Sequence, residues 1–233
     1  MKKSRNWLAL AAVAAGAACT ALGVQAGSLD GRIHELTVRF ETLQRYPDKC
    51  VPADVLRRAQ GIILLDCTKA GFGFAFQGGN GIAMVKDAHG HWSPPAFLTS
   101  SEASLGFQAG GEQDFYVILL MTRNEARELD GSVVKFGGLV RGTAGDQSSG
   151  VDGLAVPKNP GLVYSDRQGF YGGIAMKGGT LAPDNKANSN YYGHAVTMDD
   201  ILFGHKVRPT KAATDLAQKI SEYAQVYGAA NKR

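Results

Sequence analysis

The chain has 233 residues, 44% of them hydrophobic and 20% charged, which is the balance of a folded globular protein rather than a disordered one. Its formal net charge is +4 at neutral pH. If Lys2, Lys3 and Arg5 are removed with the leader described next, the basic residues fall from 25 to 22 against 21 acidic ones, which argues against a nucleic-acid partner.

Residues 1–26 predict a secretory signal peptide. A basic start, "MKKSRN", precedes an alanine-rich apolar run, and Val24 to Ala26 form a small-x-small cleavage site. We therefore expect an exported protein, periplasmic or associated with the envelope, whose residues 27–233 form a single domain. Two alternatives stay open, namely an uncleaved membrane anchor and lipidation at Cys19.

The first periodic segment of the mature chain predicts a helix that ends before Pro47. Its apolar residues recur at steps of four and three: Leu29, Ile33, Leu36, Phe40 and Leu43. Arg32 and Arg39 lie seven residues apart and share one face, and Arg45 and Lys49 follow. Basic residues beside an apolar stripe are typical of a helix at a membrane interface, although the stripe could equally pack on a sheet.

Two cysteines remain beyond the leader. Cys50 precedes a short helix expected over 52–60, and Cys67 ends the continuously apolar strand "GIILLDC". An even pair in an exported chain predicts one disulfide between Cys50 and Cys67. The alternative is two buried thiols.

The stretch "AGFGFAF" at residues 70–76 is too poorly matched to be a phosphate-binding loop. A P-loop lysine is absent, and Phe76 stands where a dinucleotide loop needs its third glycine. Phe72, Phe74 and Phe76 alternate with small residues, which predicts a core strand with one aromatic face and one nearly bare face.

Further strands are expected at "GIAMVKD", "HWSPPAFLT", "DFYVILLM" and "SVVKFGGLV". Pro94 and Pro95 cannot donate to a ladder, so "HWSPPAFLT" is expected to be an edge strand or an irregular strand. Residues 141–160 are polar and glycine-rich, as in an exposed loop or a long hairpin, and "NYYG" is expected to shape a turn. A short capped helix at "TMDDILFG" and an amphipathic helix from Ala212 to Tyr227 close the chain.

This order of elements predicts an α+β fold. Strands fill the middle of the chain and amphipathic helices stand at both ends. We therefore expect a mostly antiparallel, barrel-like sheet flanked by the N-terminal and C-terminal helices.

The order of several motifs resembles the SYLF domain family, from about Leu29 to Tyr223. The motifs are "KAGFGF", "GGNGIAMV", "GHWSPPAF", "GFQAGGEQD", "VYSDRQGFYGG" and "KANSNYYG". The resemblance implies a non-enzymatic lipid-binding domain; some eukaryotic relatives also bind actin, and many bacterial members are small exported proteins. The landmark residues of the resemblance are Lys69, Trp92, Gln108, Asn188 and Tyr192.

The predicted partners are therefore anionic phospholipids, and the alternative is a protein-interaction or envelope-scaffolding domain. The candidate lipid-binding residues are Arg32, Ile33, Leu36, Arg39, Phe40, Arg45, Lys49, Lys69 and Trp92. Catalysis has little support, because the chain has no G-x-S-x-G, H-E-x-x-H or C-x-x-C motif. His89 and His91 lack a second ligand cluster, so neither a metal nor a cofactor is predicted.

Overall fold

The structure is a computed structural model that describes residues 28–72, 74–104, 110–131, 134–136, 161–166, 169–170 and 179–225. The predicted leader and the predicted loop at 141–160 lie outside these ranges. The helices are α1 (Leu29–Gln44), α2 (Ala53–Arg58), α3 (Arg123–Arg127), α4 (Asn185–Tyr192), α5 (Met198–Leu202) and α6 (Lys211–Gln225). The strands are β1 (Gly61–Phe72), β2 (Phe74–Val85), β3 (Ala96–Ser104), β4 (Gly110–Leu120), β5 (Val134–Phe136), β6 (Leu162–Ser165), β7 (Gly169–Phe170) and β8 (Gly179–Pro183).

The described strands form one sheet in the order β5-β8-β3-β2-β1-β4-β6-β7. Every pairing in it is antiparallel. The prediction of an α+β fold with an antiparallel sheet is confirmed. The described strands form an open sheet with β5 and β7 at its two edges, and they do not close into a barrel.

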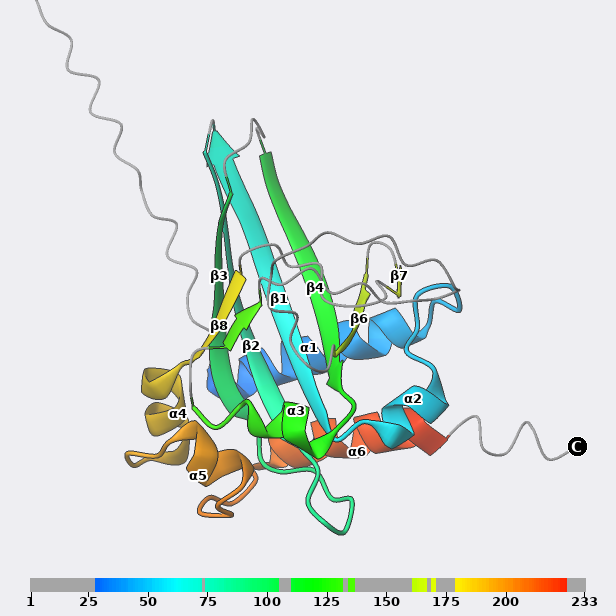
Figure 1. The fold of residues 1–233 in the computed structure, drawn as a ribbon, viewed down its shortest axis with the longest axis vertical. Coiled ribbons are helices and arrows are strands. Elements are labelled where there is room, and N and C mark those ends of the chain that lie inside the picture. Colours follow the sequence, from blue (N-terminus) through cyan, green and yellow to red (C-terminus); the bar gives the residue numbers. More distant parts are fainter. Residues whose placement is uncertain are drawn as a thin grey trace, which may run out of the picture.

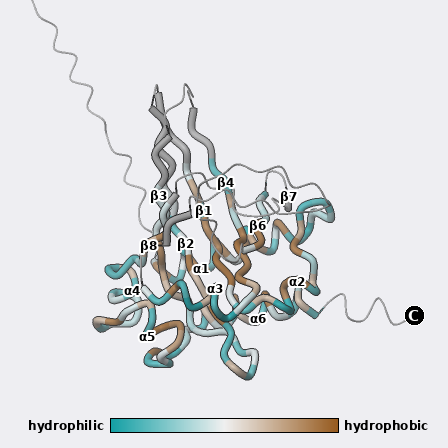
Figure 2. Tube along the Cα trace, in the orientation of Figure 1, coloured by the Kyte–Doolittle hydropathy of each residue, from teal (hydrophilic) through white to brown (hydrophobic). Residues whose placement is uncertain are grey.

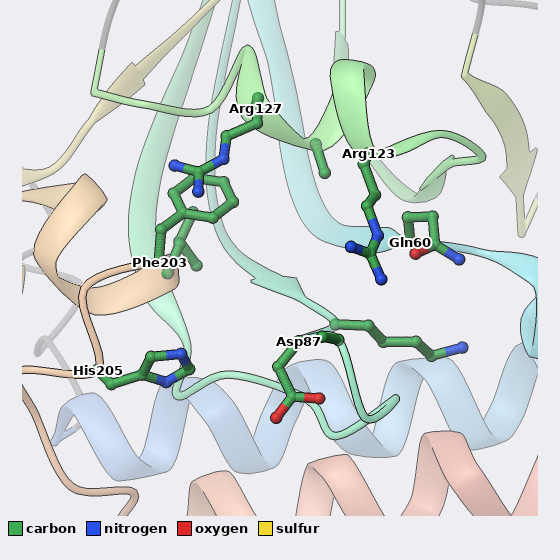
Figure 3. A pocket seen from close by; sticks show the side chains of 10 residues that line it. Gln60, Asp87, Arg123, Arg127, Phe203 and His205 are labelled. Carbon is green, nitrogen blue, oxygen red and sulfur yellow. The ribbon is translucent and has the colours of Figure 1, made fainter.

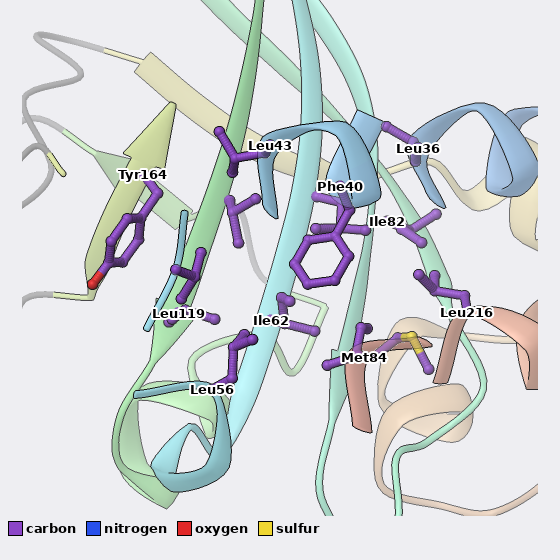
Figure 4. Close-up of a cluster of buried hydrophobic side chains, with 14 of the residues drawn as sticks. Leu36, Phe40, Leu43, Leu56, Ile62, Ile82, Met84, Leu119, Tyr164 and Leu216 are labelled. Atoms are coloured by element: carbon purple, nitrogen blue, oxygen red, sulfur yellow. The ribbon is translucent and has the colours of Figure 1, made fainter. Parts of the chain in front are cut away.

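Helices cover both faces of the sheet at its lower end (Figure 1). Because side chains alternate along a strand, Ile62 and Leu64 of β1 face α1, α2 and α6, whereas Ile63 and Leu65 face α3 and α5. Figure 4 shows the first of these two clusters, where Phe40 and Leu36 of α1 meet the strands. Burial on both faces explains why residues 61–65, the first part of β1, are continuously apolar.

Helix α1 forms where the sequence predicts it, and its apolar stripe packs on the sheet. Ser28 caps it by accepting a hydrogen bond from the Gly31 amide at 3.1 Å. The side chains of Ile33, Leu36 and Phe40 are at most 2% exposed. In Figure 2 the hydrophobic colour concentrates on the parts of β1, β4 and β6 that lie at the level of α1.

The prediction of one strand over "AGFGFAF" is wrong, because the stretch is the end of a hairpin. β1 runs to Phe72 and β2 starts at Phe74, so that Gly71 pairs with Ala75 and Ala70 with Phe76. The side chains here lie outside the described residues. A period of two continues across a tight hairpin, and for that reason alternation alone did not locate the turn.

The expected edge strand at "HWSPPAFLT" and the expected turn at "NYYG" also need correction. β3 starts at Ala96, just after the two prolines, and lies inside the sheet between β2 and β8. "NYY" is the last turn of α4, which ends at Gly193 with a φ of 77°. Asparagine, serine and tyrosine are weak helix formers, so α4 carried little helical signal.

The predicted disulfide is also wrong: Cys50 and Cys67 are not joined. Cys67 is fully buried beside Ile63 and Leu65, on the sheet face that α3 and α5 cover. Cys50 lies between α1 and α2, which both cover the opposite face. The sheet therefore separates the two sulfur atoms.

The buried side chain of Asn188 attaches α4 to β3. Its amide oxygen accepts from the Phe97 N–H at 2.7 Å, and its amide nitrogen donates to the Phe97 carbonyl at 3.0 Å. We expect Asn188→Ala to lower the free energy of unfolding by about 2–3 kcal/mol, because the Phe97 N–H loses its partner. Urea unfolding of residues 27–233 measures this.

The matched control is Asn190→Ala, on the exposed side of the same helix. Its effect should stay within about 0.5 kcal/mol. Because alanine is a better helix former than asparagine, helix propensity cannot explain a loss in either variant. Equal losses in the two variants would contradict a special role for the bond between Asn188 and β3.

Candidate functional site

The guanidinium of Arg39 links α1 to the middle strands of the sheet. Arg39 donates through Nη1 to Asp66 of β1 at 2.6 Å and through Nη2 to Asp166, just after β6, at 2.9 Å. The guanidinium carbon also lies 5.3 Å from the centre of the Phe115 ring of β4. We call Arg39, Asp66 and Asp166 the Arg39 clamp.

Backbone contacts hold Asp166 in place for this role. Its Oδ1 accepts from the Phe115 amide at 3.1 Å, and its own amide donates to the Phe115 carbonyl at 3.2 Å. The ammonium of Lys49, in the loop after α1, donates to the Asp166 carbonyl at 2.8 Å. Asp166, just after β6, therefore accepts hydrogen bonds from two of the predicted lipid-binding residues, Arg39 and Lys49.

The clamp is only partly shielded from water. Burial lowers the pKa of Arg39, but the charges and hydrogen bonds of Asp66 and Asp166 outweigh it, so the pKa lies above its ordinary value. Burial raises the pKa of Asp66, and Arg39 opposes this only in part. The cation is thus stabilised by the cluster, while the Asp66 carboxylate is held at a desolvation cost.

Arg32 and Arg45, two further cations of the predicted set, differ from each other in their contacts. The Nη1 atom of Arg32 lies 3.8 Å from a carboxylate oxygen of Asp184, and its guanidinium lies 5.6 Å from the Phe97 ring centre. Arg45, just past the end of α1, is exposed and has no ion pair among the described residues. Among Arg32, Arg39, Arg45 and Lys49, Arg45 is therefore the cation whose side chain makes no ion pair or hydrogen bond within the described residues.

The outer face of α1 carries some apolar surface of its own. Val38 is 45% exposed, and Tyr46, two residues beyond the helix, is 52% exposed. They are the exposed large hydrophobic residues of the described chain. The inner stripe of Ile33, Leu36 and Phe40 is closed to any ligand while α1 stays on the sheet.

The other predicted residues lie away from α1. Only the backbone of Lys69, in β1, is described. Trp92 is partly exposed beyond the end of β2, with the Lys86 ammonium 4.7 Å from its ring centre. Of the landmark residues, Gln108 lies outside the described ranges, and the Tyr192 hydroxyl donates to the Pro95 carbonyl at 2.6 Å.

Sequence reasoning missed Asp66 as the partner of Arg39. A signal was present, because Asp66 is the single charge in "GIILLDC", and a lone carboxylate in a buried strand needs a cation.

No helix in the described part of the chain is long and apolar enough to cross a bilayer. Across the same residues, no three histidine, cysteine or acidic side chains are grouped to bind a metal ion.

The fold is thus an open antiparallel sheet layered between helices, with its first helix fastened by charge. A family model described as "Ysc84: Las17-binding protein actin regulator" matches residues 101–223. The chain belongs to this Ysc84 family, which confirms the predicted SYLF membership.

The relatives extend the match toward the N-terminus. "SH3 domain-containing YSC84-like protein 1" of Homo sapiens is 29% identical over 189 residues, which cover 80% of this chain and 55% of that protein. "LAS seventeen-binding protein 3" of Saccharomyces cerevisiae is 28% identical over 189 residues, covering 79% and 41%. The chain thus spans about half the length of these relatives or less. No solved structure gives a significant match.

We expect Arg39→Ala to lower the free energy of unfolding by about 1–3 kcal/mol, because Asp66 and Asp166 would keep their charges without a shared cation. Urea unfolding near neutral pH measures the change. Arg58→Ala is the matched control, since Arg58 forms an exposed pair with Asp54 at 3.1 Å within α2. It should cost no more than about 0.5 kcal/mol. Equal effects would contradict a special role for the clamp.

Proposed function

We propose that the protein is a non-enzymatic domain that binds anionic phospholipid headgroups at the bacterial envelope after export and removal of residues 1–26. Binding is an equilibrium contact made by α1 and the basic residues near it. The observation that carries the proposal is the Arg39 clamp: the cations of α1 are held by carboxylates, and headgroup phosphates can replace carboxylates as their partners.

The burial of the apolar stripe sets the mechanism. Ile33, Leu36, Phe40 and Leu43 contribute about 1.5–3 kcal/mol each where they pack on the sheet. Four cations near an anionic surface contribute only about 1 kcal/mol each. Charge alone therefore cannot release α1. The free energy lost when these side chains leave the sheet is recovered only if they enter the interfacial region of the bilayer. Headgroup contact and insertion of α1 therefore occur together.

A second candidate is a protein-interaction or envelope-scaffolding domain. Val38 and Tyr46 support it, because they place apolar surface on the outer side of α1 without any release of the helix. The yeast relative is named for binding LAS seventeen, so partner binding has a precedent among the relatives. In this alternative α1 stays on the sheet, and loss of the clamp brings no gain in binding.

Flotation of residues 27–233 with vesicles separates the two candidates. We expect recovery with phosphatidylcholine–phosphatidylglycerol vesicles and little with phosphatidylcholine alone. Asp166→Asn should bind the anionic vesicles about five- to thirtyfold more tightly, because a clamp weakened by about 1–2 kcal/mol releases α1 more easily.

The control is Asp215→Asn, which removes the same charge from an exposed pair with Lys211 on α6. Its binding should rise only slightly. Equal recovery with both kinds of vesicle, or with neither, would contradict lipid binding. An equal gain in vesicle binding by Asp166→Asn and Asp215→Asn would show that net charge is the cause, and it would contradict release of α1.

A further inference from the structure

A second basic region lies at the lower end of the sheet, away from the Arg39 clamp. Two adjoining hollows of about 250 and 410 Å³ share Gln60, Lys86, Asp87, Ala88 and Arg123 in their walls. We call them together the basal hollow. Figure 3 shows Arg123 pointing from α3 into the space above the turn that carries Asp87, with Gln60 beside it. Residues far apart in the sequence thus converge on one depression of the size of small-ligand sites.

The charges around the basal hollow are mostly positive. Its walls include Arg57, Lys86, Arg123 and Arg127, against one carboxylate, Asp87. That carboxylate is already used by its own turn. Its Oδ1 accepts from the amides of His89 and His91 at 2.8 and 2.9 Å. The Oδ2 atom lies 3.4 Å from the His91 ring nitrogen.

Lys86 is a cation in the wall that the two hollows share. Its ammonium donates to the carbonyls of Leu56 at 3.2 Å and Arg57 at 2.9 Å, and it lies over the Trp92 ring. Burial lowers the pKa of Lys86, as expected for a half-buried ammonium that has no carboxylate partner in the described chain. Two of its three protons are used by these carbonyls, so one donor remains for a ligand.

Two arginines that line the hollow, Arg123 and Arg127, differ in their contacts. Arg127 is engaged, because its guanidinium stacks 4.0 Å from the Phe203 ring centre and lies 3.6 Å from a carboxylate oxygen of Asp199. Arg123 makes no side-chain hydrogen bond or ion pair within the described residues. Its planar fork of donors is therefore available to an anion lying over Lys86.

We propose that the basal hollow binds the phosphate ester group of an anionic ligand, with Arg123 as the bidentate donor and Lys86 as the cation beneath it. Paired N–H groups of arginine match two oxygens of a phosphate, and a lysine adds a point charge. This site is separate from α1 and does not rest on lipid binding there. The ester can belong to a lipid headgroup or to a soluble molecule.

Trp92 makes the site directly observable. The chain has two tryptophans, Trp7 within the predicted leader and Trp92 in the wall of the hollow. In residues 27–233 the tryptophan emission therefore comes from Trp92 alone, in the wall of this hollow. Titration with glycerol 3-phosphate and with inorganic phosphate, at ionic strength held constant with chloride, should give a saturable change in emission.

Arg123→Gln should weaken this binding about ten- to a hundredfold, because a charge-assisted bidentate contact is lost. Arg58→Gln is the matched control, since it removes one exposed charge from α2 outside the hollow and should bind as the wild type does. Thermal unfolding of both variants checks that they fold. No saturable change with either probe, or equal affinities of the two variants, would overturn the proposal.

A vesicle arm identifies the source of the phosphate. Phosphatidylcholine vesicles with and without phosphatidic acid are added to the same variants. Loss of phosphatidic-acid binding in Arg123→Gln alone assigns the site to a lipid headgroup. Binding of glycerol 3-phosphate without any response to phosphatidic acid assigns it to a soluble ester. A negative result in both arms refutes the site while leaving the proposal for α1 to its own flotation test.

Discussion

The contact between Arg39 and two aspartates joins the first helix to the middle of the sheet and is one of the polar contacts that fix its place. Asp66 comes from the central strand β1, and Asp166 follows β6 on the far side of β4, so one guanidinium joins α1 to three neighbouring strands. Apolar burial supplies most of the free energy that holds α1, but it is non-directional. The clamp supplies direction, because its hydrogen bonds fix the rotation of α1 and its position along the sheet. The stripe of α1 then closes one face of the core over β1, β2 and β4.

Much of the fold could be predicted from periodicity. The steps of three and four in α1 and α6, the capped helix at Met198 and the continuously apolar β1 all correspond to observed elements. The wrong predictions share a cause. A local sequence pattern does not show where the chain turns or which other segments lie between two residues in the folded protein. Alternation continued through the hairpin between Phe72 and Phe74, and an even number of cysteines said nothing of the sheet that separates Cys50 from Cys67.

The candidate sites were predictable to different degrees. Arg39 and Lys49 stood out because they flank an amphipathic stripe, but their partners are 27 and 117 residues away in the sequence, beyond any local pattern. The basal hollow had no sequence signal except Trp92. It forms because antiparallel strands bring the turn after β2 next to the start of β1 and the helix after β4. Proposals for such sites depend on the three-dimensional arrangement of charges that are single and unremarkable in the chain.

Release of α1 is the central claim, and a distance between α1 and α6 tests it most directly. Spin labels at exposed Val38→Cys and Asp215→Cys, in a Cys50→Ser and Cys67→Ala background, report that distance by pulsed electron paramagnetic resonance. A reference pair at Asn190→Cys and Asp215→Cys reports α4 against α6. The account predicts that anionic vesicles lengthen the first distance and leave the second unchanged, while neutral vesicles alter neither. An unchanged first distance in protein that is bound to anionic vesicles would contradict it.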